Sequence, residues 1–167
     1  MAKTIAGLLP LAVALVGVGV AIWWLLSRQM AAGTWLLAAV VTGHGLIHVL
    51  FVTPPPASAA APGAAEWPFD MSRSWLATRA GTDLNLMRLV GTVLVCVVAL
   101  GFVLTGLATA GILIPSGWWQ GLVVVSAAVS AVVLVLFFNV QLVLGLGLDA
   151  VLVWAAFAAI WTPAAAA

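Results

Sequence analysis

Long apolar runs alternate along the chain with short polar or proline-containing breaks. Five runs stand out, at residues 5–26, 31–52, 86–110, 118–138 and 142–161. A helix needs about 20 mostly apolar residues to cross the hydrocarbon core of a bilayer, and each run meets that requirement. The pattern therefore predicts an all-α fold, a polytopic membrane helical bundle of about five transmembrane helices, formed as a single domain by residues 1–167.

The first run has two interpretations. Its apolar stretch is longer than the core of a secretory signal, which has about 7 to 15 residues, and no small-x-small cleavage site precedes the next run. We therefore expect residues 5–26 to form a retained helix.

The break between the last two runs also has two candidate positions. Asn139-Val140-Gln141 is the most polar point near the middle of a stretch that is otherwise almost continuously apolar. A break at Gly145-Leu146-Gly147, with Asp149 as the cap of the next helix, would leave only about 13 residues for the last helix, too few to cross a bilayer. The length requirement favours the turn near Asn139.

A long connection, residues 53–85, separates the second and third runs. Its first part, residues 53–65, is rich in Pro and Ala and predicts a stiff, extended linker. Its second part interleaves aromatic and charged residues: Trp67, Asp70, Arg73, Trp75 and Arg79. This mixture favours an amphipathic turn or short helix in the headgroup layer, with a partner-docking surface or a lid over a site as alternatives.

Orientation follows from the distribution of basic residues. Five crossings place the N-terminus, the long connection and the Asn139 turn on one side of the membrane. Lys3, Arg73, Arg79 and Arg88 fall on that side, and Arg28 alone falls on the other. Because Lys and Arg concentrate in cytoplasmic loops, we expect the N-terminus to be cytoplasmic.

Composition narrows the function classes. The chain is 66% hydrophobic and 5% charged, with a mean hydropathy of +1.31 and a net charge of +1. The lipid bilayer must be its main solvent, and such a chain has no basic surface for nucleic acid. No serine-nucleophile elbow and no phosphate-binding glycine loop is present, so an enzyme is less favoured than a non-catalytic protein. The single Cys96 excludes an internal disulfide.

Two histidines lie inside the second apolar run. His44 and His48 are one helical turn apart, on a face shared with Leu37, Val41 and Phe51. Ionisable side chains inside a span usually face the interior of the bundle and mark a site, because burial without partners is costly.

Asp149 is the acidic residue placed to reach this pair. At 1.5 Å per residue, His48 and His44 lie roughly 8 and 14 Å from the Thr53 end of the second run, and Asp149 lies roughly 12 Å from Gln141 at the start of the fifth. Both ends lie on the same side of the membrane, so the three side chains can share one layer. Asn139 and Gln141 would then lie at the mouth of this layer.

Four interpretations of the layer remain open. The histidines are a structural pair that hydrogen-bonds other helices, or one of them ligates haem b, with Gly43 and Gly45 leaving room for a flat ring. Alternatively, His44, His48 and Asp149 bind a transition metal. In the fourth interpretation the same groups form a proton or ion relay.

Small residues elsewhere in the spans indicate close helix packing. Gly17, Gly19, Gly101 and Gly106 belong to this class, as do Ser126 and Ser130, which lie one turn apart. Small side chains let helix backbones approach closely in membranes, so we assign these residues to packing rather than to chemistry.

The stretch His44 to His48, "HGLIH", resembles a group of small multipass bacterial membrane proteins of actinobacterial type, mostly uncharacterised, that carry the His-Gly-Leu-Ile-His motif. Gln141 and Asp149 fall near the later polar positions of that group, and the "WPFD" and "SRSWL" segments resemble an elaboration of its loop. The resemblance implies a short helical bundle in the bacterial cytoplasmic (inner) membrane and brings no established activity.

The sequence thus predicts a non-catalytic integral membrane protein, an accessory or cofactor-holding subunit built around His44, His48 and Asp149. It would act with other membrane subunits or as a homo-oligomer. A small transporter or a proton- or ion-conducting protein that uses the same polar layer is the alternative.

Overall fold

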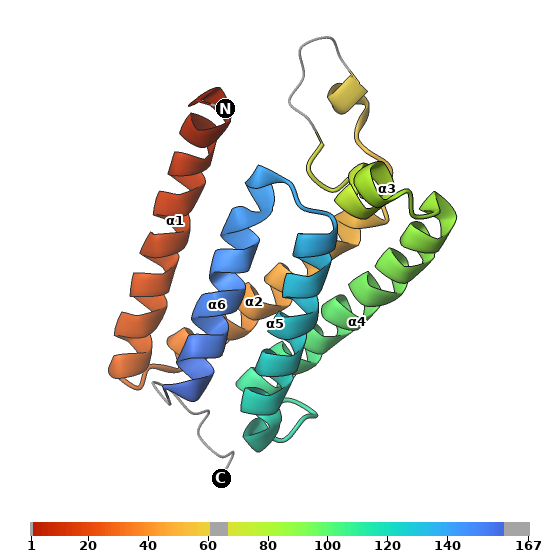
Figure 1. Ribbon diagram of the computed structural model, residues 1–167. Coiled ribbons are helices and arrows are strands. Elements are labelled where there is room, and N and C mark those ends of the chain that lie inside the picture. Colours follow the sequence, from red (N-terminus) through yellow and green to blue (C-terminus); the bar gives the residue numbers. More distant parts are fainter. Residues whose placement is uncertain (1, 61–66, 159–167) are drawn as a thin grey trace.

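Five long helices make up the chain in the computed structural model, which describes residues 2–60 and 67–158 (Figure 1). These helices are α1 (Ala2–Ser27), α2 (Ala31–Ile47), α4 (Leu84–Ala110), α5 (Trp119–Leu136) and α6 (Val143–Phe157). Short 3-10 turns extend three of them: η1 (His48–Phe51) follows α2, η4 (Ser116–Trp118) precedes α5, and η5 (Val140–Leu142) precedes α6.

The predicted fold class is confirmed. The described residues contain no strand, and with their 3-10 extensions five helical segments are long and apolar enough to cross a membrane. The protein is therefore an all-α, multipass membrane protein. The last predicted span, residues 142–161, ends in part outside the described residues.

The helix ends follow from local sequence. Asp83 caps α4, because its Oδ1 accepts hydrogen bonds from the backbone N–H groups of Asn85 and Leu86, both at 2.9 Å. The same helix ends at Gly111, whose φ of 69° is left-handed and costs a glycine little. The second span ends in η1, just before Pro54.

The turn between α5 and α6 lies at Asn139. The Oδ1 atom of Asn139 accepts a hydrogen bond from the backbone N–H of Gln141 at 3.0 Å and so caps η5. Gly145 and Gly147 are both inside α6, and Asp149 is a buried residue of that helix rather than its cap. The break at Gly145–Gly147 is thus wrong, and η5 together with α6 forms an 18-residue segment, Val140–Phe157, that is long and apolar enough to cross.

Each long helix packs mainly against one or two of the others. Helix α4 packs against α2 on one side and α5 on the other, and α6 packs against α5. Helix α1 lies at the edge of the bundle and packs chiefly against α2 (Figure 1). Most of the buried core comes from the other four helices and includes Val41, Val98, Phe102, Val123, Leu134 and Leu152.

Glycines set the close approach of α4 to its neighbours. A Cβ on Gly45 of α2 would collide with the Cβ of Phe102, and one on Gly106 would collide with the Thr42 hydroxyl. A Cβ on Gly101 would likewise collide with the Ser126 hydroxyl of α5. The packing role predicted for Gly101, Gly106 and Ser126 is therefore confirmed. The packing role predicted for Gly17 and Gly19 is wrong, since nothing lies within 4 Å of a Cβ built on either.

The connection between α2 and α4 contains three short helical segments, η2 (Ala57–Ala60), η3 (Met71–Arg73) and α3 (Trp75–Ala80). Two of its side chains reach the end of α5: the Ser74 hydroxyl donates to the Leu136 carbonyl at 2.7 Å, and the Trp75 indole N–H donates to the Val135 carbonyl at 2.9 Å. The last carbonyls of a helix have no intrahelical partner, so the connection caps α5.

Of the charged residues predicted for this connection, Asp70 caps η3 by accepting from the backbone N–H of Ser72 at 2.9 Å. Arg79 is exposed in the last turn of α3. The side chain of Arg73 lies outside the described part of the chain.

We predict that Gly45→Ala destabilises the bundle and that Gly43→Ala does not. The new methyl group at residue 45 must displace Phe102, which costs about 1–3 kcal/mol when a packed core is overfilled. Gly43, half a turn away on the same helix, has open space around it and is the matched control. The midpoint of unfolding in mixed micelles of rising dodecyl sulfate content measures the difference, and equal midpoints would contradict the packing described.

Candidate functional site

Helix α2 delivers both histidines to the interior of the bundle. His44 lies in its last turn, and His48 follows one turn later, at the start of η1. The residues are 9% and 1% exposed, respectively. Their rings contact each other edge to face, with centroids 5.2 Å apart, and the ring of Phe102 from α4 packs against His44 at 4.9 Å. Both imidazoles are therefore shielded from lipid.

Four hydrogen bonds form a network around these histidines, and two of them join the histidines to α5 and α6. The Nε2–H of His44 donates to Oδ1 of Asp149 at 2.8 Å, and the Ser130 hydroxyl donates to Oδ2 of the same carboxylate at 2.7 Å. Oγ of Ser130 also lies 2.9 Å from Nε2 of His48. The Nδ1–H of His48 donates to the backbone carbonyl of His44 at 2.9 Å. We call His44, His48, Ser130 and Asp149 the polar network.

The polar network holds three helices together. Asp149 is 3% exposed and Ser130 is fully buried, so α2, α5 and α6 meet at polar side chains inside an apolar bundle. The hydrogen bonds use both carboxylate oxygens of Asp149 and both ring nitrogens of His48. Buried polar groups are costly unless they are paired, and here the pairing comes from other members of the network.

The protons of the network can be counted from its donors and acceptors. A carbonyl oxygen only accepts, so Nδ1 of His48 carries a proton. The Ser130 hydroxyl has one proton but two polar neighbours, Nε2 of His48 and Oδ2 of Asp149. For both contacts to be hydrogen bonds, one neighbour must carry a proton of its own.

That additional proton has two positions. On Oδ2 of Asp149 it leaves a neutral acid and a neutral His48, and Ser130 donates to His48. On Nε2 of His48 it leaves a carboxylate and an imidazolium, and Ser130 donates to Asp149. The two arrangements contain the same number of protons and differ by a concerted shift of two protons through the Ser130 hydroxyl. With a neutral His44, both have zero net charge, which suits a site inside a membrane.

A pocket adjoins each end of this path. Phe51, whose ring centroid is 6.4 Å from that of His48, lines a pocket of about 480 Å³ on the side of the connection between α2 and α4. Asp149 lines a second pocket of about 400 Å³ between α5 and α6. The rest of this second pocket is formed by Ala127, Ala128, Ala131, Leu146, Ala150, Val153 and Trp154.

Of the residues predicted for the site, the structure brings together His44, His48 and Asp149. Asn139 and Gln141 instead contact each other at the cap of η5. Ser130 was assigned to packing alone, yet it is the central member of the network. Ser126 and Ser130 have the same spacing along the helix, so the sequence alone does not show which of them reaches the histidines. The contacts of each serine depend on which neighbouring helix lies opposite it.

The site does not fit haem. A flat ring beside His44 would need the space next to Gly45, which Phe102 fills. The Nε2 atoms that would ligate iron are hydrogen-bonded to Asp149 and Ser130. A transition metal would need the same Nε2 atoms, which are already hydrogen-bonded. The described residues also contain no group of three or more His, Cys, Asp or Glu side chains placed to hold a metal ion.

Comparison of the chain with protein-family models, with curated proteins and with solved structures gave no match. The geometry of the polar network is therefore the basis for a functional proposal.

We predict that Ser130→Ala destabilises the protein by about 1–3 kcal/mol, because it leaves Nε2 of His48 and Oδ2 of Asp149 facing each other without a bridging hydroxyl. Ser126→Ala is the matched control, since it removes a buried hydroxyl from the same helix, outside the network. Unfolding in mixed micelles, followed by circular dichroism, measures both. If the two substitutions have the same effect, the network does not contribute as described.

Proposed function

We propose that this protein transfers protons within the membrane and that His48, Ser130 and Asp149 form the transfer path. One observation carries the proposal: the Ser130 hydroxyl lies between an imidazole nitrogen and a carboxylate oxygen, at 2.9 and 2.7 Å. Serine hydroxyls can donate and accept at once, so a proton crosses this bridge without large movement of heavy atoms.

The transfer step balances as follows. Asp149 gives its Oδ2 proton to Oγ of Ser130, while the Ser130 hydroxyl proton passes to Nε2 of His48. The product is a carboxylate and an imidazolium. His44 keeps its Nε2–H on Oδ1 and stabilises the carboxylate, and the His44 carbonyl holds Nδ1–H of His48 so that Nε2 remains the exchanging atom.

Net transfer then requires exchange at both ends. Because Nε2 of His48 faces Ser130, its proton leaves only when the imidazole ring turns away from Ser130 toward Phe51 and the 480 Å³ pocket, while Asp149 takes up a proton from the pocket between α5 and α6, or the reverse. One aromatic ring separates His48 from the first pocket, whereas Asp149 itself lines the second. The position of Asp149 on the wall of the second pocket supports the proposal, but the rest of that wall is apolar, so exchange at this end requires water to enter the pocket.

We further propose that the protein belongs to a bacterial cytoplasmic membrane and that its N-terminus is cytoplasmic. The start of α1, the connection that contains α3 and the turn between α5 and α6 lie at the same end of the bundle (Figure 1). Arg79 and Arg88 lie at that end and Arg28 at the other. This distribution supports the orientation through the positive-inside rule.

A non-catalytic accessory subunit, acting with other membrane subunits or a second copy of the chain, is the second candidate. The observation that favours it is the burial of the polar network, which joins α2, α5 and α6 whether or not a proton moves. In that case the network is a structural element only, without a cofactor.

Proton flux into vesicles tests the first candidate. We expect purified protein in liposomes, with a potassium diffusion potential and an entrapped pH dye, to acidify the lumen faster than empty liposomes. Asp149→Asn and Ser130→Ala should lower this flux by about a hundredfold, the scale of a lost proton-transfer group. Both substitutions nearly preserve side-chain volume.

Ser126→Ala is again the control and should keep the wild-type flux, since its hydroxyl lies outside the path. Wild-type flux no higher than that of empty liposomes would exclude the relay and leave the accessory role. Unchanged flux in Asp149→Asn would exclude this path even if the protein conducts protons.

A further inference from the structure

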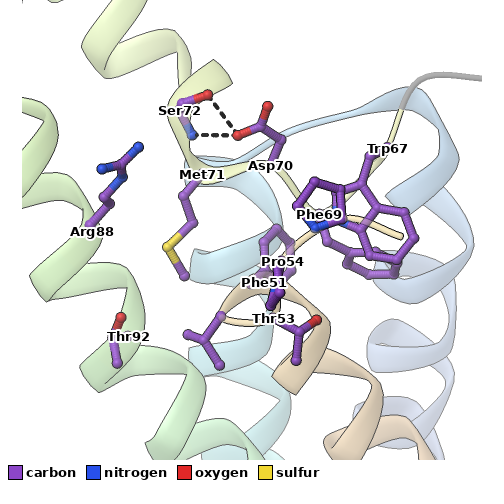
Figure 2. Close-up of a pocket in the computed structure, with 12 residues that line it drawn as sticks. Phe51, Thr53, Pro54, Trp67, Phe69, Asp70, Met71, Ser72, Arg88 and Thr92 are labelled. Carbon is purple, nitrogen blue, oxygen red and sulfur yellow. Dashed lines mark hydrogen bonds between the residues drawn. The ribbon is translucent and has the colours of Figure 1, made fainter. Parts of the chain in front are cut away.

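The 480 Å³ pocket has a chemistry that the relay does not use. It lies where the end of α2, the Trp67–Ser72 segment and the first turns of α4 meet (Figure 2). It is lined by Phe51, Val52, Thr53, Pro54, Pro55, Trp67, Phe69, Asp70, Met71, Ser72, Arg88 and Thr92. Figure 2 shows Arg88 and Thr92 on one side and Trp67 on the other.

Within residues 2–60 and 67–158, two hydrogen-bond donors without a partner lie on opposite sides of the pocket, one exposed and one buried. Arg88 is exposed, and the structure gives its guanidinium no ion pair among the described residues. Nε1 of Trp67 is buried and has no hydrogen-bond acceptor in the described part of the chain. A buried indole N–H usually has a partner, so an acceptor is expected there.

The wall between these donors combines aromatic and aliphatic side chains with the Asp70 carboxylate, whose Oδ1 already accepts hydrogen bonds from the backbone N–H and hydroxyl of Ser72. Phe51 and Phe69 pack edge to face with ring centroids 5.2 Å apart, and Phe69 packs against Trp67 at 5.3 Å. Pro54, Pro55 and Val52 extend this surface. A ligand that matches the pocket therefore combines an anionic group for Arg88, a second acceptor for Trp67 and an apolar portion.

The depth of the pocket identifies a source for such a ligand. Arg88 lies one turn into α4, about 6 Å along the helix from Leu84, and Thr92 lies one turn further. This is the level at which a spanning helix passes from the headgroup layer into hydrocarbon. Anionic phospholipids have phosphate and ester oxygens at that level, directly above their acyl chains.

We propose that this pocket binds one anionic phospholipid, with its phosphate on the Arg88 guanidinium and Thr92 hydroxyl and, after a shift of the Trp67 ring that exposes the buried Nε1, an ester or headgroup oxygen on that atom. A free phosphate ion fits less well, because a single arginine faces it and most of the wall would stay uncovered. The relay uses the same pocket for exchange at His48, but lipid binding requires no proton transfer, so the binding test does not depend on the relay.

Native mass spectrometry of the detergent-purified protein tests the site with dioctanoyl phosphatidylglycerol as the probe. We expect the wild type to bind one molecule in preference to dioctanoyl phosphatidylcholine. Arg88→Gln should weaken this binding about tenfold, since it removes a charge-assisted contact with the phosphate. Trp67→Phe should also weaken it, because it keeps the ring and removes the N–H.

Arg79→Gln is the matched control, because Arg79 is exposed at the same end of the bundle and outside the pocket. It should leave phosphatidylglycerol binding unchanged. Equal losses in Arg79→Gln and Arg88→Gln would overturn the site in favour of general surface charge, and equal binding of the two lipids would overturn it as well. Displacement of the lipid by millimolar inorganic phosphate would overturn the assignment to a phospholipid.

Discussion

The structure depends on one constraint: polar groups inside a bilayer must find partners within the protein, because lipid offers none. His44, His48, Ser130 and Asp149 meet it as a group. Burying any one of these side chains without the others would cost the free energy of an unpaired polar group. Because their partners come from different helices, the positions of α2, α5 and α6 depend on one another. The glycines that bring α2 and α5 close to α4 serve the same end, since the hydrogen bonds of the network, at 2.7–2.9 Å, tolerate little displacement of a helix.

The backbone carbonyls at the end of α5 also find their hydrogen-bond partners within the protein. They accept hydrogen bonds from the Ser74 hydroxyl and the Trp75 indole, which come from the connection between α2 and α4. That connection is thus anchored to the bundle. It also forms one wall of the pocket beside Phe51, so the same residues that cap a helix shape a ligand site.

Much of the fold could be predicted because the bilayer imposes a length on each element. The five spans and the Asn139 turn follow from apolar runs and from the requirement that α6 be long enough to cross. The meeting of His44 with Asp149 was predicted from helical rise along two spans that start on the same side of the membrane.

The rest could not be predicted, because it depends on which faces of different helices meet. Ser130 and Ser126 are equivalent in sequence, but only Ser130 faces α2 and α6 in the layer of the histidines. The room that Gly45 offers beside His44 suggested a cofactor, and the structure places Phe102 of α4 there. Spacing along one helix gives the direction of a side chain, whereas the identity of its partner requires the packed bundle.

The proton count links the stability of the bundle to its proposed chemistry. If the additional proton leaves, Ser130 can donate to only one neighbour, and the other contact sets a lone pair on Oγ against a lone pair on Nε2 or Oδ2. Such a contact at 2.7 to 2.9 Å is repulsive, so loss of the proton strains the junction of α2, α5 and α6. A network that needs a proton to hold three helices together also has a driving force to recover that proton, and this is the property that a relay requires between successive transfers.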